Sequence, residues 1–396
     1  MRVLLGAFGD PGHAFPMLAL GEALVARGHD VALQTWRRWE GPATAAGMTF
    51  AAAPEYQVFP TRERPLKPYA AAVRAAAETR PVVRSFAPDV AVADILTPAP
   101  ALAAELEGVP VATLVPHVHP QLPPGFPPYA IGARLPRTAV GSGLWRATDR
   151  LVARGLERGR REYNECRARL GLGPLPWLHT GLSRSLTLVA TLPQLEYPRD
   201  WPRWLRVVGP LLWEPPGERV EAPPGPGPVV LVAPSTAQDP EHRLLRAALA
   251  GLAGEPVRVI ATYNGREPSP PVTVPGNAVL VPWLSYSQTM PACDLVVAHG
   301  GHGTLMRALA CGCPVVLSPA GGDMAENAAR VDWAGLGVRL PRRLCTPRGV
   351  RLAARRALGR TSLAPRVRRV AAWIAAHDGG VRAAEELEAW FRRGTP

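Results

Sequence analysis

The chain is poor in cysteine and has no long apolar run. Its 396 residues include five cysteines, whose irregular spacing forms no paired framework. We therefore expect a reduced, cytoplasmic protein. No run of about 18 apolar residues occurs, so the sequence predicts no integral membrane segment. The short apolar run after Met1 indicates a first β-strand and not a signal peptide.

Several common binding motifs are also missing. Gly6, Gly9 and Gly12 are three residues apart, unlike the G-x-G-x-x-G turn of nicotinamide-dependent oxidoreductases, and no acid follows the second strand pattern. No Asp-x-Asp follows a strand and no His/Cys spacing fits zinc, so we expect no metal and no cofactor. Basic residues are not interleaved with aromatics in any nucleic-acid-binding pattern, which argues against a nucleic-acid partner.

Positive charge is in excess, with a formal net charge of +13. Arginine dominates this excess and falls mostly on helical patterns, as at Arg158, Arg160, Arg161 and Arg167. The pattern fits solvated helix faces, and a lipid-facing patch is the alternative.

Short apolar strands alternate with amphipathic helices in two series, and the first predicted helix covers Phe15 to Arg27. Such alternation predicts an α/β protein with two doubly wound, Rossmann-like parallel sheets and a ligand cleft between them. A Pro- and Gly-rich stretch without periodicity separates the series. We predict an N-terminal domain over 1–212, a linker over 213–228, a C-terminal domain over 229–365 and a helical tail over 366–396 that packs back toward the N-terminal domain.

The stretch from Val296 to Asn327 is the most informative. A buried strand pattern ends in His299-Gly300-Gly301-His302-Gly303-Thr304, and a helical pattern follows. Glycines allow backbone N–H groups to approach an anion, and a helix start adds unpaired donors and partial positive charge. A second strand brings Asp323 to the same crevice. This layout suggests a nucleotide diphosphate that carries a hydroxyl-rich group.

Three motifs resemble those of GT-B fold glycosyltransferases of family 1, in particular the bacterial natural-product type. They are Gly12-His13-x-x-Pro16-Met17, Val281-Pro282-Trp283 and the block from His299 to Asn327. The resemblance covers almost the whole chain. It implies a nucleotide-sugar site in the C-terminal half, an acceptor site in the N-terminal half and a metal-independent, inverting transfer.

The resemblance also implies roles for individual residues. His13 is the expected general base, and Asp94 is the expected acid that orients it. The sequence around Asp94 is also typical of a residue that caps the next helix. Asp323 is expected to contact the donor sugar, or else to cap the next helix. The remaining donor-binding candidates are Ser235, Thr236, Trp283, His299, Gly300, Gly301, Gly303 and Thr304.

Two positions depart from the family pattern. Arg307 stands where many relatives have a Glu that bonds both ribose hydroxyls, and Arg cannot accept hydrogen bonds. Met324 stands where Gln is common. These departures favour a thymidine diphosphate (dTDP) donor over a uridine diphosphate (UDP) donor, with a deoxygenated sugar.

Long, aromatic segments over 54–69 and 117–137 predict an acceptor site for a bulky, apolar aglycone. Tyr56, Phe59, His117 and Phe126 are the candidate acceptor-binding residues. Two other functions stay open: a non-catalytic protein that binds a nucleotide sugar and activates a partner, and a transferase with a lipid acceptor at a membrane surface. A monomer or homodimer is expected.

Overall fold

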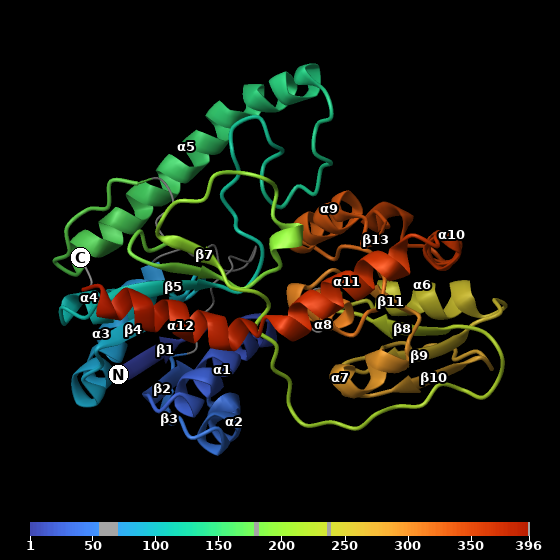
Figure 1. Cartoon of the computed structure of the whole chain (residues 1–396), viewed down its shortest axis with the longest axis horizontal. Coiled ribbons are helices and arrows are strands. Elements are labelled where there is room, and N and C mark those ends of the chain that lie inside the picture. Colours follow the sequence, from blue (N-terminus) through green and yellow to red (C-terminus); the bar gives the residue numbers. More distant parts are fainter. Residues whose placement is uncertain (55–69, 178–181, 236–238, 395–396) are drawn as a thin grey trace.

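The computed structural model describes residues 1–54, 70–177, 182–235 and 239–394. Two parallel β-sheets, each covered by helices, form two lobes that lie side by side (Figure 1). The N-terminal sheet has the strand order β3-β2-β1-β4-β5-β6-β7 and the C-terminal sheet the order β10-β9-β8-β11-β12-β13. The predicted α/β class with two doubly wound parallel sheets is confirmed.

The N-terminal lobe is built from the first half of the chain. Its strands are β1 (Arg2–Gly6), β2 (Asp30–Thr35), β3 (Thr49–Ala52), β4 (Val90–Asp94), β5 (Val111–Val115), β6 (Thr187–Val189) and β7 (Leu205–Val207). Its helices are α1 (Pro11–Ala26), α2 (Glu40–Ala45), α3 (Ala70–Phe86), α4 (Pro98–Leu106) and α5 (Ala139–Arg169). The central strands β1 and β4 are almost wholly buried, as expected for strands covered on both faces.

The C-terminal lobe repeats this plan. Its strands are β8 (Val229–Ala233), β9 (Arg258–Thr262), β10 (Ala278–Val281), β11 (Leu295–Ala298), β12 (Val315–Leu317) and β13 (Gly337–Arg339). Its helices are α6 (Arg243–Leu252), α7 (Tyr286–Thr289), α8 (His302–Ala310), α9 (Met324–Ala334) and α10 (Pro347–Gly359). Residues 213–228, between the two series, form no helix or strand.

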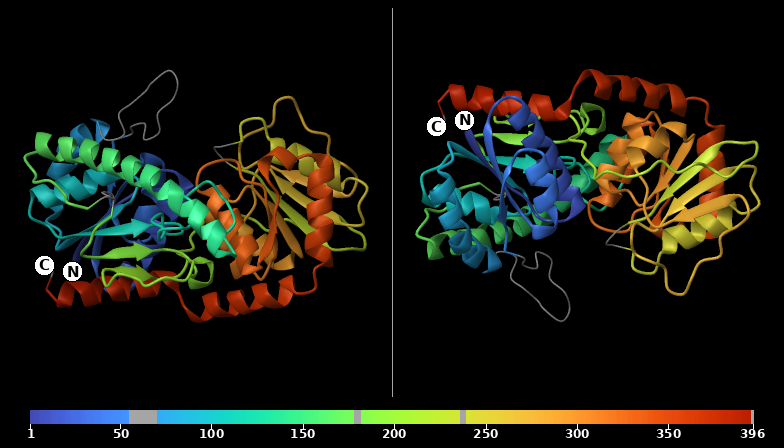
Figure 2. Two further views of the ribbon diagram at one scale, coloured as in Figure 1. Left: turned by 90° about the horizontal axis from the view of Figure 1, so that it is seen from above. Right: turned by 90° about the horizontal axis from the view of Figure 1, so that it is seen from below.

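Two final helices, α11 (Leu363–Ala376) and α12 (Gly379–Arg392), join the lobes. They run along one side of the molecule from the C-terminal to the N-terminal lobe (Figure 2). Helix α11 packs on α8, whereas α12 packs on α1. Leu387 and Trp390 of α12 belong to the same apolar core as Leu5 of β1. The end of the chain thus forms part of the N-terminal core.

Helix α1 begins earlier than the sequence pattern predicted. It starts at Pro11, because proline is favoured in the first helical turn, where its missing N–H leaves no bond unmade. His13 therefore lies in the first turn of α1 and not in a loop before it.

Candidate active site

Both sheets place their candidate site residues where the strand order reverses. In the N-terminal sheet β1 lies between β2 and β4, and in the C-terminal sheet β8 lies between β9 and β11. The connections after such neighbouring strands run to opposite faces, which opens a crevice at the carboxyl ends of the strands. His13 follows β1 and Asp94 ends β4, while Ser235 follows β8 and His299 follows β11.

His13 and Asp94 form a hydrogen-bonded pair. The Nδ1 atom of His13 lies 2.9 Å from Oδ1 of Asp94, whose side chain is only 1% exposed. Asp94 also accepts hydrogen bonds from the backbone N–H of Phe8 and from the hydroxyl of Thr97. Thr97, and not Asp94, is the N-cap residue of α4. The alternative role of Asp94 as a helix cap is therefore not what its geometry shows.

The pair sets the protonation of His13. Burial alone would lower the pKa of His13, but the charge of Asp94 and the hydrogen bond to it outweigh burial and raise the pKa above its usual 6.5. Because Asp94 engages Nδ1, the Nε2 atom is the ring nitrogen left to exchange a proton. The His13 side chain is 15% exposed, so a small part of it remains accessible.

Aromatic side chains surround the His13 ring. Phe8 and His117 meet it edge-on, with ring centroids 6.0 and 6.4 Å away. The Nδ1 atom of His117 lies 2.8 Å from the carbonyl oxygen of Val118 and 3.2 Å from the hydroxyl of Tyr129. Burial lowers the pKa of His117, which favours the neutral form of this ring beside His13. The structure thus brings the candidate acceptor residue His117 to the base.

The glycine-rich turn after β11 leads directly into helix α8. Gly300 has a φ of +89°, which favours glycine, and a Cβ there would lie 3.0 Å from the carbonyl oxygen of Met324. A Cβ at Gly301 would lie 2.3 Å from the His299 ring, whereas one at Gly303 would meet nothing within 4 Å. Leu305 donates the first bond within the helix, to Gly301.

This turn offers donors to an anion. The N–H groups that precede Leu305 at a helix start have no partner within the helix, and they carry the positive end of its dipole. The space beside Gly303 is open on the side where a Cβ would stand. An anionic group can therefore approach the backbone here, as phosphates do at other helix starts.

The other donor candidates follow strands of the same C-terminal sheet or lie at the start of α8. The Nδ1 atom of His299 lies 3.1 Å from the carbonyl oxygen of Ala233, and burial lowers the pKa of the ring. Ser235 is buried and Thr304 half-buried. Trp283 follows β10 and is 41% exposed, so it does not fill the core. Thr236 lies outside the described residues.

Asp323 links the two halves of the site. It is the N-cap residue of α9, yet its side chain accepts no capping hydrogen bond. Its negative charge adds to the rise in the pKa of His13, and it partly opposes the lowering of the pKa of His117 and of His299 by burial. The charge of one carboxylate therefore acts on histidines of both lobes.

Two interactions of the site were missed by sequence reasoning. Glu214, in the linker, lies 3.7 Å from Arg307 and accepts hydrogen bonds from Ser285 and Ser287. An acid in a stretch without periodicity gives no sign of such a role. Arg307 and Glu214 are each less than 20% exposed, so this pair belongs to the wall of the lobe and not to a solvated surface.

The second missed interaction is a buried ion cluster between the lobes. Arg330 of α9 is 0% exposed and pairs with Glu326 on its own helix and with Glu196 of the N-terminal lobe, at 2.8 and 2.6 Å. Arg330 also donates to the carbonyl oxygens of Leu195 and His119. This cluster ties the helix that begins at Asp323 to the N-terminal lobe.

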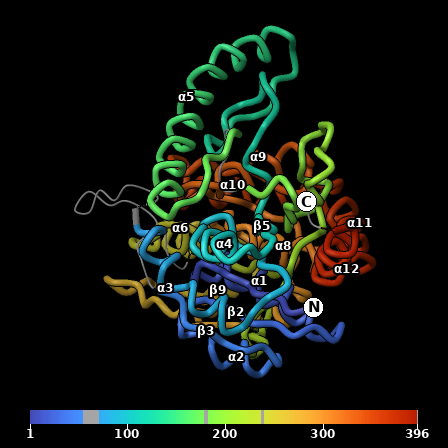
Figure 3. The backbone as a smooth tube through the Cα atoms, turned by 90° about the vertical axis from the view of Figure 1, so that its left-hand side faces the viewer, coloured from blue at the N-terminus to red at the C-terminus, as the bar shows by residue number. Residues whose placement is uncertain are grey.

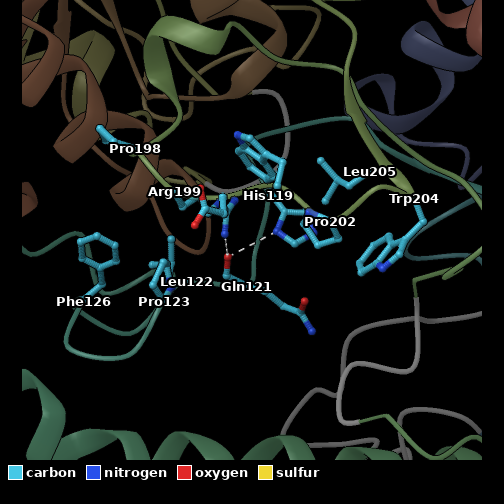
Figure 4. A pocket seen from close by; sticks show the side chains of 12 residues that line it. His119, Gln121, Leu122, Pro123, Phe126, Pro198, Arg199, Pro202, Trp204 and Leu205 are labelled. Carbon is cyan, nitrogen blue, oxygen red and sulfur yellow. Dashed lines mark hydrogen bonds between the residues drawn. The ribbon is translucent and has the colours of Figure 1, made fainter.

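The acceptor candidates are only partly described by the structure. Tyr56 and Phe59 lie outside the described residues. Phe126 lines a cavity of about 490 Å³ beside the guanidinium of Arg199, which is held 3.7 Å over the ring of Trp201 (Figure 4). A second hollow lies between Phe8 and Trp36, next to the buried Gln34 and Thr79. Of these two hollows in the described residues, the second includes Phe8, which contacts His13 directly.

The described residues offer neither a metal site nor a membrane-spanning helix. Within the described ranges, no group of three or more His, Cys, Asp or Glu side chains is placed to hold a metal ion. In the same part of the chain, no helix combines the length and the apolar character needed to cross a bilayer. The five cysteines are free thiols.

Known proteins with related sequences are biosynthetic enzymes. Residues 245–389 match the family described as "Erythromycin biosynthesis protein CIII-like, C-terminal domain". The 4'-demethylrebeccamycin synthase of Lentzea aerocolonigenes is 29% identical, over 98% of this chain and 99% of its own length. The O-mycaminosyltylonolide 6-deoxyallosyltransferase of Streptomyces fradiae is 32% identical, over 60% of this chain and 58% of its own.

Solved structures show the same architecture along the whole chain. The calicheamicin glycosyltransferase CalG4 superposes with a TM-score of 0.76 at 24% identity, and the glycosyltransferase VinC in complex with dTDP with a TM-score of 0.74 at 20% identity. Each superposition covers 100% of both chains. Two facing Rossmann-like lobes of this kind define the GT-B class. The superpositions show that the chain has the GT-B fold, and its sequence is similar to those of natural-product biosynthetic enzymes.

Proposed function

We propose that the protein moves a sugar from a nucleotide diphosphate to a hydroxyl group of a bulky apolar acceptor, with inversion at the anomeric carbon and without a metal. The observation that carries this proposal is the His13–Asp94 pair, which lies at one strand-order reversal, where the charge of Asp323 from the other lobe also acts on His13. A base, an anion site and a sugar-binding carboxylate are then available in one place.

His13 acts as the general base in this reaction. Its Nε2 atom takes the proton of the acceptor hydroxyl while the hydroxyl oxygen attacks the anomeric carbon. Asp94 holds the Nδ1–H and stabilises the imidazolium that forms. A base positioned in this way contributes roughly 10²- to 10⁴-fold to the rate. Because the new bond forms opposite the breaking one, a single displacement inverts the configuration.

The leaving diphosphate is stabilised by the start of α8. The bond between the anomeric carbon and the diphosphate oxygen breaks, and the oxygen keeps the electron pair. Backbone N–H groups near Gly301 and Gly303 meet this growing negative charge, and the helix dipole adds to their effect. Fixed donors of this kind perform the task that a divalent cation performs in metal-dependent enzymes.

We favour dTDP over UDP as the nucleotide of the donor. Arg307 offers no acceptor for a ribose hydroxyl, and the nearby Glu214 is engaged by Ser285, Ser287 and Arg307 itself. A solved relative in fold, VinC, is in complex with dTDP. Calorimetric titration with both nucleotides tests this preference. We expect tighter binding of dTDP, and a clear preference for UDP contradicts it. Arg307→Glu should narrow the difference between the affinities for dTDP and UDP. Arg307→Gln, which removes the positive charge without adding a carboxylate, is the matched control.

Release of the nucleotide in the presence of a panel of apolar aglycones tests the reaction itself. We expect nucleotide release and a glycosylated product by mass spectrometry, both insensitive to a chelator. A protein that binds the nucleotide sugar but glycosylates no aglycone would instead be a non-catalytic binding protein. Loss of turnover with chelator would contradict the metal-free reaction.

A further inference from the structure

Exposed apolar side chains are concentrated in one short part of the molecule. Eleven large apolar side chains are exposed among the residues that the structure describes. Five of them fall within residues 131–152, a small fraction of the chain: Ile131, Val140, Leu144, Leu151 and Val152. A scattered distribution would need no explanation, but a cluster of this kind marks a surface that contacts something apolar.

Three of these residues lie along one side of helix α5. Val140, Leu144 and Leu151 are spaced four and seven residues apart, which places them on one stripe of an α-helix. Their exposed fractions are 75%, 69% and 65%. The buried residues of α5 all lie in its last two turns, at Tyr163, Cys166 and Arg167. The first turns instead project beyond the lobe (Figures 1 and 3).

The same helix carries a row of arginines beside the apolar stripe. Arg146, Arg150 and Arg154 follow one another at intervals of four residues and are all exposed. None of the three forms an ion pair with an acid in the described part of the chain. Residues 131–161 contain eight arginines but only two acids, so much of the chain's excess positive charge is gathered here.

We propose that this surface, the α5 ridge formed by Val140, Leu144, Leu151 and the arginine row, binds peripherally to an anionic lipid bilayer. An amphipathic helix with aliphatic residues on one side and arginines beside them lies in the plane of a bilayer surface. There its apolar side chains enter the acyl boundary and its cations meet the headgroups. The part of α5 that carries these residues projects beyond the rest of the lobe, so that a flat surface can reach it (Figure 3).

Two other occupants fit the ridge less well. A second copy of the chain in a symmetric contact would bring two arginine rows together, and like charges repel. A protein partner is favoured by aromatic anchors in the centre of a surface. The exposed apolar residues of the ridge are instead all aliphatic, and Trp145 on the same helix is not exposed.

Membrane contact would matter for substrate access but does not depend on the proposed reaction. The segment that leads into α5 begins at His117, next to the candidate base, and passes Gly132, where a Cβ would lie 2.6 Å from the carbonyl oxygen of Ala325 in α9. The ridge is thus continuous in sequence with the wall of the site. An apolar acceptor that partitions into a bilayer would be concentrated at this entrance.

Co-sedimentation with large unilamellar vesicles tests the proposal on the full chain. We expect binding to vesicles of phosphatidylcholine with 30% phosphatidylglycerol at low salt, and little binding to phosphatidylcholine alone. Each arginine near an anionic surface contributes about fivefold in affinity, so Arg146→Gln/Arg150→Gln/Arg154→Gln should lower binding about 100-fold. Leu144→Gln/Leu151→Gln should lower it at least ~10-fold, because these side chains no longer leave water.

A charge-matched variant on the other lobe is the control. Arg348, Arg351 and Arg356 of α10 are exposed, and the triple change to Gln alters the net charge equally. It should bind nearly as well as the wild type. Equal losses in both triple variants, or no binding to anionic vesicles at low salt, overturn the proposal. A dimer in light scattering that is lost in the leucine variant, without vesicle binding, would assign the ridge to a second copy instead.

Discussion

His13 and Asp94 are joined by a 2.9 Å hydrogen bond although 81 positions separate them in the chain. The register of two neighbouring strands explains this contact, because Gly6 of β1 pairs with Ala93 of β4. The residues that follow these partners emerge at the same edge of the sheet. The central feature of the candidate active site is therefore fixed by strand pairing and not by a local sequence motif.

Removal of the base should abolish most of the transfer activity but should hardly affect binding of the nucleotide diphosphate. We expect His13→Ala to lower the rate of nucleotide release with acceptor by roughly 10²- to 10⁴-fold, which is the usual contribution of a positioned general base. The affinity for the nucleotide diphosphate, measured by calorimetry, should change little. Asp94→Asn should also slow transfer, because an amide cannot stabilise the imidazolium. Equal rates for His13→Ala and wild type would refute the assignment of the base.

The raised pKa of His13 should appear in the pH profile of transfer. The neutral ring is the active form, so we expect kcat/KM to fall as the pH is lowered through a pKa above 6.5. In Asp94→Asn this limb should move to lower pH, because burial then acts on His13 without the opposing charge. The protonated His13–Asp94 pair also stabilises the folded protein. This contribution to the free energy of unfolding should be complete below about pH 6.5, and it should be lost as the pH rises through the raised pKa of His13. If kcat/KM fell at the same pH in Asp94→Asn and in the wild type, the role of Asp94 in raising the pKa of His13 would be contradicted.

Two glycine substitutions should separate anion binding from folding. Gly303→Ala meets no neighbour and adds a methyl group at the open side of the helix start. We expect unchanged or slightly higher thermal stability but weaker nucleotide binding, since the methyl occupies space that the diphosphate needs. Gly12→Ala, also without neighbours, is the control. Gly300→Ala should lose stability as well, because φ is +89° and the carbonyl of Met324 is close. Normal binding by Gly303→Ala would place the anion elsewhere.

Loss of Arg330 should destabilise the protein strongly. Arg330→Met leaves Glu326 buried without its cation and leaves Glu196 with Arg199 alone, and removal of one partner of a buried pair typically costs about 3–5 kcal/mol. Urea unfolding measures the effect, and Arg330→Met/Glu326→Gln should recover part of it. Arg355→Met is the control. Its pair with Glu255 involves an arginine that is 63% exposed and therefore screened by solvent, so we expect a much smaller loss of stability.

The sequence predicted the fold well because strands and helices in α/β proteins have distinct apolar periods. It also predicted which residues follow the strands that carry the site, since the ends of parallel strands meet at one edge. The start of α1 was predicted too late, at Phe15. The glycines at positions 9 and 12 suggested a turn there, whereas Pro11 opens the helix.

Contacts between the lobes could not be predicted in the same way. Arg330 and Glu196 are 134 positions apart and lie on different lobes, so their pairing depends on how two complete cores meet. The pair of Glu214 and Arg307 depends on the path of a linker without periodicity. The apolar stripe of α5 was equally hidden, because the sequence alone does not show which face of a helix lacks a partner.

A crystal structure of the complex with thymidine diphosphate tests the central claim most directly. The account predicts that the diphosphate lies against the backbone N–H groups at the start of α8, with its terminal phosphate on the side of His13 and Asp323. Density for the diphosphate away from Gly301 and Gly303, or a His13 ring closed off from it by other side chains, would contradict the account.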